Sequence, residues 1–172
     1  DVLVNNAGIT KMGLMEQIPH EDWLNIIQVN LIGTYTMSVA ALPYMKEQAY
    51  GKIINLGSDS SLIGYPLMTA YAASKHGVLG LTRSLAEEVK ASGIQVNAVC
   101  PAFVDTDMTP AAMRKDAIPT SQVAEVVQFL SSERSNGITG EEIKVYGKQD
   151  MNWFGSKQIP MIQAMLNRKE PM

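Results

Sequence analysis

The chain has 172 residues, of which 46% are hydrophobic and 18% are charged, and its formal net charge is −3. That length suits one domain with a sizeable core, while the small negative charge without a basic cluster argues against nucleic acid and anionic membranes as partners. Cys100 stands alone, which excludes an internal disulfide, and two histidines without ligand spacing argue against a metal site. No membrane span and no signal peptide is recognisable, so we expect a cytoplasmic location.

Strand and helix patterns alternate along the first half of the chain. Residues 1–4 are apolar and predict a short buried strand, which the turn residues 5–8 end. Helical periodicity runs from residue 21 to about residue 48, and we expect Pro43 to kink this helix or to split off its last turn. Residues 51–57 predict a second strand, after which a polar loop begins.

The second half of the chain repeats this alternation. The predicted elements are a long helix over residues 69–91, a strand over 94–100, a helix over 122–132 and a strand over 142–146. We expect Thr120 or Ser121 to cap the third helix, and Gly77 and Gly80 to let another backbone approach the second helix closely. Such an order predicts βαβ crossovers, hence an α/β fold with a doubly wound parallel sheet of about four strands and helices on both faces.

Residues that directly follow the predicted strands are candidates for a ligand site. In a parallel α/β sheet, ligands bind outside the carboxyl ends of the strands. Here those positions hold Asn5-Asn6-Ala7-Gly8, Ser58, and Pro101 to Val104. Asparagine and glycine are also ordinary strand terminators, so these residues alone would fit simple turns as well.

Tyr71 and Lys75 stand four residues apart in the predicted second helix, which places both side chains on one face. A nearby ammonium favours the phenolate and lowers a tyrosine pKa, so Tyr71 would be able to exchange a proton near neutral pH. An amphipathic helix with an exposed tyrosine and a solvated lysine would give the same spacing.

Taken together, these motifs resemble the short-chain dehydrogenase/reductase family, and within it the 3-oxoacyl-carrier-protein reductases. The likeness runs over residues 1–147, most of the chain. The matching residues are Asn5-Asn6-Ala7-Gly8, Asn30 in Val-Asn-Leu-Ile-Gly, Ser58, Tyr71-x-x-x-Lys75 and Pro101-x-x-Val104-x-Thr106, with a gap of thirteen from Ser58 to Tyr71. The resemblance implies a Rossmann-like fold over residues 1–147, with residues 148–172 as a C-terminal extension.

The resemblance also implies an oxidoreductase that transfers a hydride between NAD or NADP and a carbonyl or secondary alcohol. Tyr71 would be the general acid/base, and Ser58 would bind the reacting oxygen. Lys75 would lower the Tyr71 pKa and bind the nicotinamide ribose, and Asn30 would hold a water of a proton relay. The cofactor-binding residues implied in this way are Asn6, Ala7, Gly8, Tyr71, Lys75, Pro101, Val104 and Thr106.

One part of the family pattern is missing from the sequence. Family members open with a glycine-rich strand–turn–helix that binds the pyrophosphate, and we interpret its absence as a lack of about 75–90 residues. We therefore expect residues 1–4 to form an exposed sheet edge, and the 172-residue chain alone to bind a dinucleotide weakly or not at all. The choice between NAD and NADP cannot be read. The alternative is a truncated, catalytically inactive paralogue that acts only through oligomerisation.

The resemblance further implies a homo-oligomer through the helices 21–48 and 69–91. Ala102 departs from the family's usual glycine. The segment 109–120, which in the family forms a lid over the substrate, is short, so either the pocket would be more open or the C-terminal tail would supply the lid. We expect Asp59 to point to solvent. The candidate substrate-facing residues are mostly apolar and favour a carbonyl on a hydrophobic or acyl body; they are Ile9, Leu62, Tyr65, Met108 and Met113.

Overall fold

The computed structural model of the protein describes residues 1–149, without the side chains of residues 112 and 113. Its four strands form one parallel sheet in the order β1-β2-β3-β4. The strands are β1 (Val2–Asn5), β2 (Gly51–Leu56), β3 (Ile94–Pro101) and β4 (Glu142–Val145). Each predicted strand is therefore present to within one residue at either end, and the predicted parallel sheet is confirmed.

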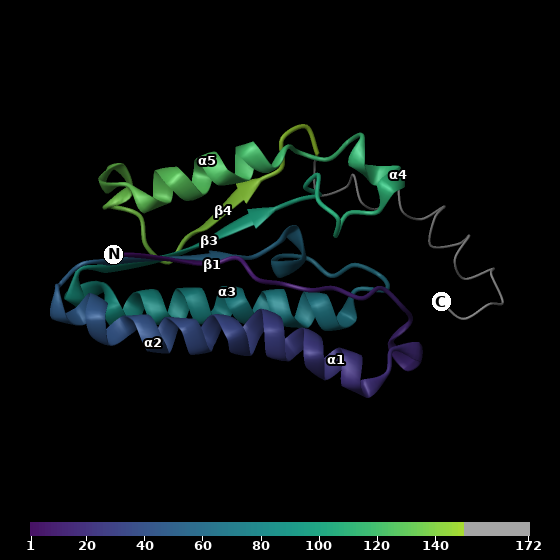
Figure 1. The fold of residues 1–172 in the computed structure, drawn as a ribbon, viewed down its shortest axis with the longest axis horizontal. Helices are drawn as coiled ribbons and strands as arrows, with labels where there is room; N and C mark the ends of the chain where they lie inside the picture. The colour runs from purple at the N-terminus through teal and green to yellow at the C-terminus, as the bar shows by residue number, and fades with distance from the viewer. Residues whose placement is uncertain (150–172) are drawn as a thin grey trace.

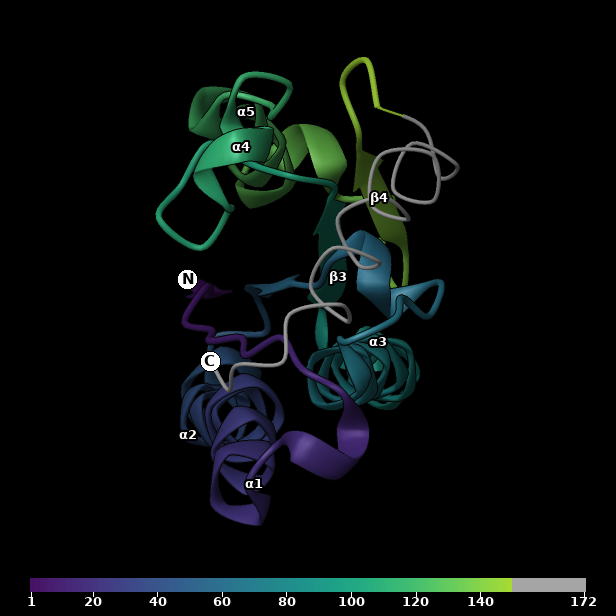
Figure 2. The same cartoon turned by 90° about the vertical axis from the view of Figure 1, so that its right-hand side faces the viewer.

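Helices cover both faces of the sheet, as predicted (Figures 1 and 2). One face carries α1 (His20–Ile27), α2 (Gly33–Glu47) and α3 (Thr69–Val89), whereas α5 (Thr120–Ser131) covers the other. A short helix that the sequence did not predict, α4 (Ala111–Arg114), lies beyond the carboxyl ends of the strands (Figure 1).

The core divides into two layers because side chains alternate along each strand. On β2, Ile53 packs with Met45 and Val96 on the face covered by α2 and α3. Its neighbour Ile54 packs with Val99 on the opposite face, under α5. This double burial explains why the strands read as continuous apolar runs.

The helical run between β1 and β2 is less regular than its periodicity predicts. Between α1 and α2 lies a π-helical turn, Gln28–Ile32, in which the Gly33 N–H donates to the Gln28 carbonyl five residues earlier. The helix then continues through Pro43 to Glu47, so the prediction that its last turn splits off is wrong. The run His20–Glu47 is long and apolar enough to cross a membrane, a criterion that core helices of soluble proteins also meet. This corrects the expectation that no segment reaches that length and apolarity.

Two further local predictions fail. The N-cap of α5 is Pro119 and no side chain caps the helix, because Thr120 and Ser121 already lie inside its first turn. At Gly77 the close neighbour is the Leu31 side chain, 2.7 Å from where a Cβ would lie, and not another backbone as predicted; a Cβ at Gly80 would meet nothing within 4 Å.

The β1 edge and the start of the C-terminal segment are the remaining features that frame the site. Val2 and Val4 on β1 are 42% and 40% exposed, so β1 is an edge strand in the described part of the chain. Gln149 binds the backbone of Phe103 in both directions, accepting from its N–H and donating to its carbonyl at 3.1 Å each. The division of the chain at residue 147 stays a prediction, and the predicted tail beyond residue 149 lies outside the described residues.

Candidate active site

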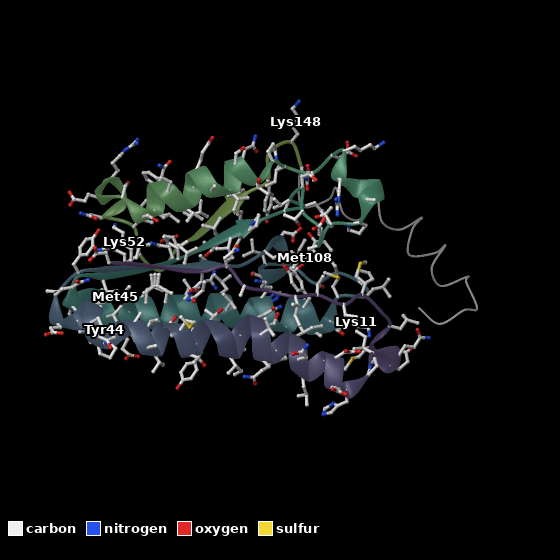
Figure 3. All side chains as sticks on the ribbon, viewed as in Figure 1. Lys11, Tyr44, Met45, Lys52, Met108 and Lys148 are labelled. Carbon is white, nitrogen blue, oxygen red and sulfur yellow. The ribbon has the colours of Figure 1, made fainter. Side chains whose placement is uncertain are left out.

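A cleft of about 970 Å³ opens at the carboxyl ends of the strands. Its walls come from the segments that follow β1, β2 and β3, from the start of α3, and from α5. The sequence-predicted residues among its lining are Asn6, Ala7, Gly8, Ser58, Tyr71, Lys75, Val104 and Thr106. Figure 3 shows Met108, another lining residue, at this end of the sheet, whereas Lys52 lies toward the other end.

Tyr71 is buried on the first turn of α3, next to Ser58 at the end of β2. Burial raises the pKa of the Tyr71 phenol to about 12; a hydrogen bond with Ser58 opposes this shift, and the charge of Asp59 adds to it. The pKa therefore moves in the direction opposite to the prediction from Lys75, because the desolvation of a phenolate outweighs any attraction to the ammonium.

Lys75 lies one turn further along α3, with its Nζ 5.7 Å from the centre of the Tyr71 ring. Its ammonium donates to the Leu56 carbonyl at 2.6 Å. Burial lowers the pKa of Lys75 to about 8. An ammonium has three N–H donors, and this carbonyl is the one hydrogen-bond acceptor that the described residues offer it, so Lys75 has donors left for a ligand in the cleft.

Asn30 lies behind the cleft rather than in its lining, inside the π-helical turn. Its amide binds the Ile9 backbone twice and donates to the Ser74 hydroxyl at 3.0 Å. The main-chain carbonyl of Asn30 accepts from the Thr34 hydroxyl at 2.8 Å. Asn30 thus connects the loop after β1 to α3, and the water-holding role remains a prediction.

Asp59 does not point to solvent, which corrects the expectation from the sequence. Its carboxylate accepts from the hydroxyls of Ser58 at 2.8 Å and Tyr65 at 3.0 Å. Burial raises the pKa of Asp59, and these hydrogen bonds oppose the shift. Asp59 is in the cleft lining, and its place directly after Ser58 was the signal that identified it as a neighbour of the site.

The residues predicted to bind a cofactor divide into two groups. Asn6, Ala7 and Gly8 line the cleft where β1 ends, and a Cβ on Gly8 would lie 3.6 Å from the Lys75 Nζ. Pro101 does not line the cleft, because it forms the last residue of β3, whereas the following Ala102 does.

The other predicted cofactor-binding residues that follow β3 are Val104 and Thr106. Both line the cleft. The Val104 carbonyl accepts from the Thr109 hydroxyl at 2.6 Å, and its backbone pairs with Ile118 in an isolated bridge. These contacts hold the segment 102–109 against the start of α5.

Of the residues predicted to face the substrate, only some lie where the prediction places them. Met108 lines the cleft, but Leu62 packs beside the core cluster of Leu79, Ala98 and Cys100, and Ile9 is not in the lining. Tyr65 binds Asp59 instead, and the side chain of Met113 lies outside the described residues. The sequence reasoning missed the cleft residues Thr10, Met12 and Met68, since irregular loops carry no periodic signal.

Fold and site together define a Rossmann-like α/β protein with a cleft at the carboxyl edge of its sheet. A sequence profile of the family described as "short chain dehydrogenase" matches residues 1–117. The chain therefore belongs to the short-chain dehydrogenase family, which confirms the resemblance.

Curated relatives agree with this assignment. The 3-oxoacyl-[acyl-carrier-protein] reductase FabG of Thermotoga maritima is 41% identical over 159 residues, and the match covers 86% of this chain and 65% of that protein. The reductase of the same name from Haemophilus influenzae is 40% identical, with 86% of this chain and 66% of that protein covered. The chain thus spans just under two thirds of the length of these relatives.

Solved structures show the same fold. ElxO with NADP bound has a TM-score of 0.81 at 32% identity, covering 90% of this chain and 67% of that chain. A gluconate 5-dehydrogenase from Burkholderia cenocepacia in complex with NADP and tartrate has a TM-score of 0.81 at 28% identity, covering 90% of this chain and 65% of that one. None of these similarities supports the alternative of an inactive paralogue.

Proposed function

We propose that the protein is an oxidoreductase that transfers a hydride between NAD or NADP and a carbonyl or secondary alcohol. The observation that carries this proposal is the convergence of Ser58, Tyr71 and Lys75 in one cleft at the carboxyl edge of the sheet. Family membership and the NADP bound in two similar structures support the same activity.

The cleft fits a nicotinamide cofactor on its own chemistry. Lys75 has donors left for a ribose hydroxyl, and Asn6, Ala7 and Gly8 offer a wall of small or amide side chains. Val104 and Thr106 would face the nicotinamide end. When bound, the cofactor supplies or accepts the hydride. The choice between NAD and NADP stays open.

The protein's own residues would manage the proton and the charge. Tyr71, protonated in its buried position, would donate a proton to the carbonyl oxygen in reduction and accept one in oxidation. The Ser58 hydroxyl would bind that oxygen and stabilise its developing charge. Asn30 would keep the loop after β1 against α3, and so hold Lys75 and Gly8 in place.

The substrate that the cleft favours is an apolar carbonyl compound. Met12, Met68, Phe103 and Met108 give the cleft adaptable apolar walls. The names of the curated relatives make a 3-oxoacyl thioester the first candidate for this chain. A sugar acid, as in the name of the gluconate 5-dehydrogenase, is the second candidate, which the apolar walls disfavour.

We also propose a homo-oligomer through α1, α2 and α3, and a cytoplasmic location. Apolar side chains on the outer surface of the run His20–Glu47 support the first: Leu24, Ile32, Tyr35, Met37, Val39 and Tyr44 are 38–73% exposed. Figure 3 shows Tyr44 directed away from the sheet on α2. Patches of this kind mark interaction surfaces.

The test of the proposed activity is turnover of a 3-oxoacyl thioester with NADH or NADPH, followed by nicotinamide absorbance. The cofactor concentration is raised to saturation, because the 172-residue chain is expected to bind a dinucleotide weakly. Tyr71→Phe should reduce kcat by about a thousandfold or more while leaving cofactor affinity near that of the wild type, because it removes only the proton. Tyr44→Phe, on the exposed side of α2, is the matched control. Full activity in Tyr71→Phe would overturn the mechanism.

A further inference from the structure

We propose that Asp59 is a positioning residue of this site, whose carboxylate competes with the reacting oxygen for the one hydroxyl proton of Ser58. This inference rests on the proposed function, in which Ser58 binds the oxygen of the carbonyl or alcohol. It adds a residue to the site that neither the spacing of the sequence motifs nor the family resemblance assigned a role.

The Asp59 carboxylate is held on both of its oxygens. Oδ1 accepts from the Ser58 hydroxyl at 2.8 Å and from the Ser60 N–H at 2.7 Å, while Oδ2 accepts from the Tyr65 hydroxyl at 3.0 Å. The carboxylate is therefore fixed between the end of β2 and the loop that leads to α3. A group with this many partners cannot rotate away from Ser58 without breaking them.

The Ser58 hydroxyl has only one proton to give. It accepts from the Ser60 N–H at 3.2 Å and donates to Asp59, which uses its donor. The Tyr71 oxygen, and the oxygen of a substrate beside it, need that same donor when they carry negative charge. Ser58 can satisfy Asp59 or the reacting oxygen at one time, but not both.

Charge acts in the same direction as this competition. An ionised Asp59 near Tyr71 raises the pKa of the phenol, adding to the effect of burial. The other titratable groups that face this pair are Tyr65, the Lys75 ammonium, Cys100 at the end of β3 and Tyr146 after β4. Asp59 is the charged group that accepts from the Ser58 hydroxyl directly, at 2.8 Å.

The consequence is a bias in the direction of catalysis with pH. While Asp59 is ionised it keeps the Ser58 proton and disfavours the phenolate, so Tyr71 stays in the acid form that carbonyl reduction needs. Alcohol oxidation needs Tyr71 as a base, and its rate should rise only at alkaline pH. Neutralising Asp59 should weaken its hold on the Ser58 proton, because a neutral amide or hydroxyl oxygen accepts less strongly than a carboxylate, and should move that rise to lower pH.

A double-mutant cycle on Ser58 and Asp59 tests the shared proton without any need for turnover. The protein is labelled at the tyrosine ring carbon that bears the hydroxyl, each tyrosine is titrated by NMR, and Tyr71→Phe assigns the Tyr71 signal. Asp59→Asn should lower the titration midpoint of Tyr71 by about one pH unit. Asp59→Ser is a second neutral variant with the same expected direction, should the asparagine variant fail to fold.

The substitution Ser58→Ala tests whether Asp59 and Tyr71 share the Ser58 proton. With Asp59 present the substitution should raise the Tyr71 midpoint only slightly, because Asp59 draws the Ser58 proton away from the phenol and leaves a weak hydrogen bond to lose. In the Asp59→Asn background it should raise the midpoint by about one pH unit, since the released donor is then lost. Equal effects of Ser58→Ala in both backgrounds would overturn the proposal.

An activity measurement separates this inference from the proposed function. In the wild type and in Asp59→Asn, the pH dependence of alcohol oxidation should show the same shift to lower pH as the Tyr71 midpoint. A coupled NMR cycle with no turnover in any variant, at a cofactor concentration shown to saturate the protein, would retain the role of Asp59 and reject the oxidoreductase. Turnover with an unshifted pH profile in Asp59→Asn would reject the role of Asp59 and retain the oxidoreductase.

Discussion

Asn30 binds the backbone of Ile9 through both atoms of its amide: Oδ1 accepts from the Ile9 N–H at 2.8 Å, and Nδ2 donates to the Ile9 carbonyl at 3.0 Å. Because Nδ2 also donates to the Ser74 hydroxyl, one buried side chain connects the loop after β1 to α3. The π-helical turn around Asn30 offsets this residue from regular helix geometry.

Asn30→Leu should therefore lower the free energy of unfolding by about 2 kcal/mol or more, because it leaves three buried or partly buried polar groups without their partner. Urea unfolding followed by circular dichroism measures the change. Asn25→Leu, an exposed asparagine on α1, is the matched control. Equal stabilities of the two variants would show that the Asn30 contacts do not hold the loop.

Lys75 predicts a specific pH dependence of stability. Its pKa is lowered to about 8 in the fold, against about 10.4 for an unperturbed lysine. Between these values the unfolded chain binds more protons than the folded one, so the contribution of Lys75 makes the free energy of unfolding rise as pH rises. Below the folded pKa, burial of the charged Lys75 lowers the free energy of unfolding by about 3 kcal/mol, and this destabilisation disappears as the pH rises to the unfolded pKa.

Removing Lys75 should remove this rise. The free energy of unfolding of Lys75→Met, measured from pH 7.5 to pH 10 by about five urea titrations, should increase with pH less steeply than that of the wild type. Lys90→Met, which removes an exposed lysine just after α3, controls for a change of surface charge. A Lys75→Met variant whose slope matches the wild type would mean that burial does not perturb the ammonium.

Gly57 is a position where the site excludes any side chain. A Cβ there would lie 2.7 Å from the Cys100 Sγ and 3.0 Å from the Ser61 Oγ, which is closer than such atoms pack. Both neighbours are buried, so neither can move aside freely. Gly57→Ala should cost about 1–3 kcal/mol of stability as overpacking.

A second substitution identifies the cause. Cys100→Ala removes the nearer of the two obstructing atoms, so the double variant Gly57→Ala/Cys100→Ala should be more stable than the sum of the single effects predicts. Gly64→Ala, where a Cβ would meet nothing within 4 Å, is the control and should be nearly neutral. Strict additivity of the two substitutions would place the strain elsewhere than at Cys100.

Local pattern was enough to predict the four strands and the longer helices, because β2 and β3 are buried over almost their whole length and the longer helices carry apolar residues at helical spacing. The same pattern could not reveal the π-helical turn at Asn30, which adds a residue to the helix without changing its apolar spacing. The predicted orientation of the Asp59 side chain, toward solvent, was wrong for a different reason. The position of its hydrogen-bond partner Tyr65 depends on the conformation of the loop between β2 and α3. Loop conformations leave no periodic pattern in a sequence.

Within the site, proximity was easier to predict than protonation. Ser58, Tyr71 and Lys75 meet because a helix spacing and a strand end determine where they lie. The pKa of Tyr71 depends on how much water the surrounding chain excludes, and burial decides it against the attraction of Lys75. That balance is a property of the packed structure and has no counterpart in the spacing of two residues.

The exposed apolar face of α2 makes a last prediction, on assembly. Tyr35 and Val39 stand four residues apart, so they share one face of the helix, and they are 52% and 48% exposed. If this face is the subunit interface, the double substitution Tyr35→Lys/Val39→Lys would bury charges against the partner and should weaken association at least a hundredfold. Sedimentation velocity over a range of protein concentrations measures the shift toward monomer. Ser121→Lys, on α5 at the opposite side of the sheet, should leave the association unchanged. An unaltered oligomer in the double variant, with the control also unaltered, would mean that the interface lies on another surface.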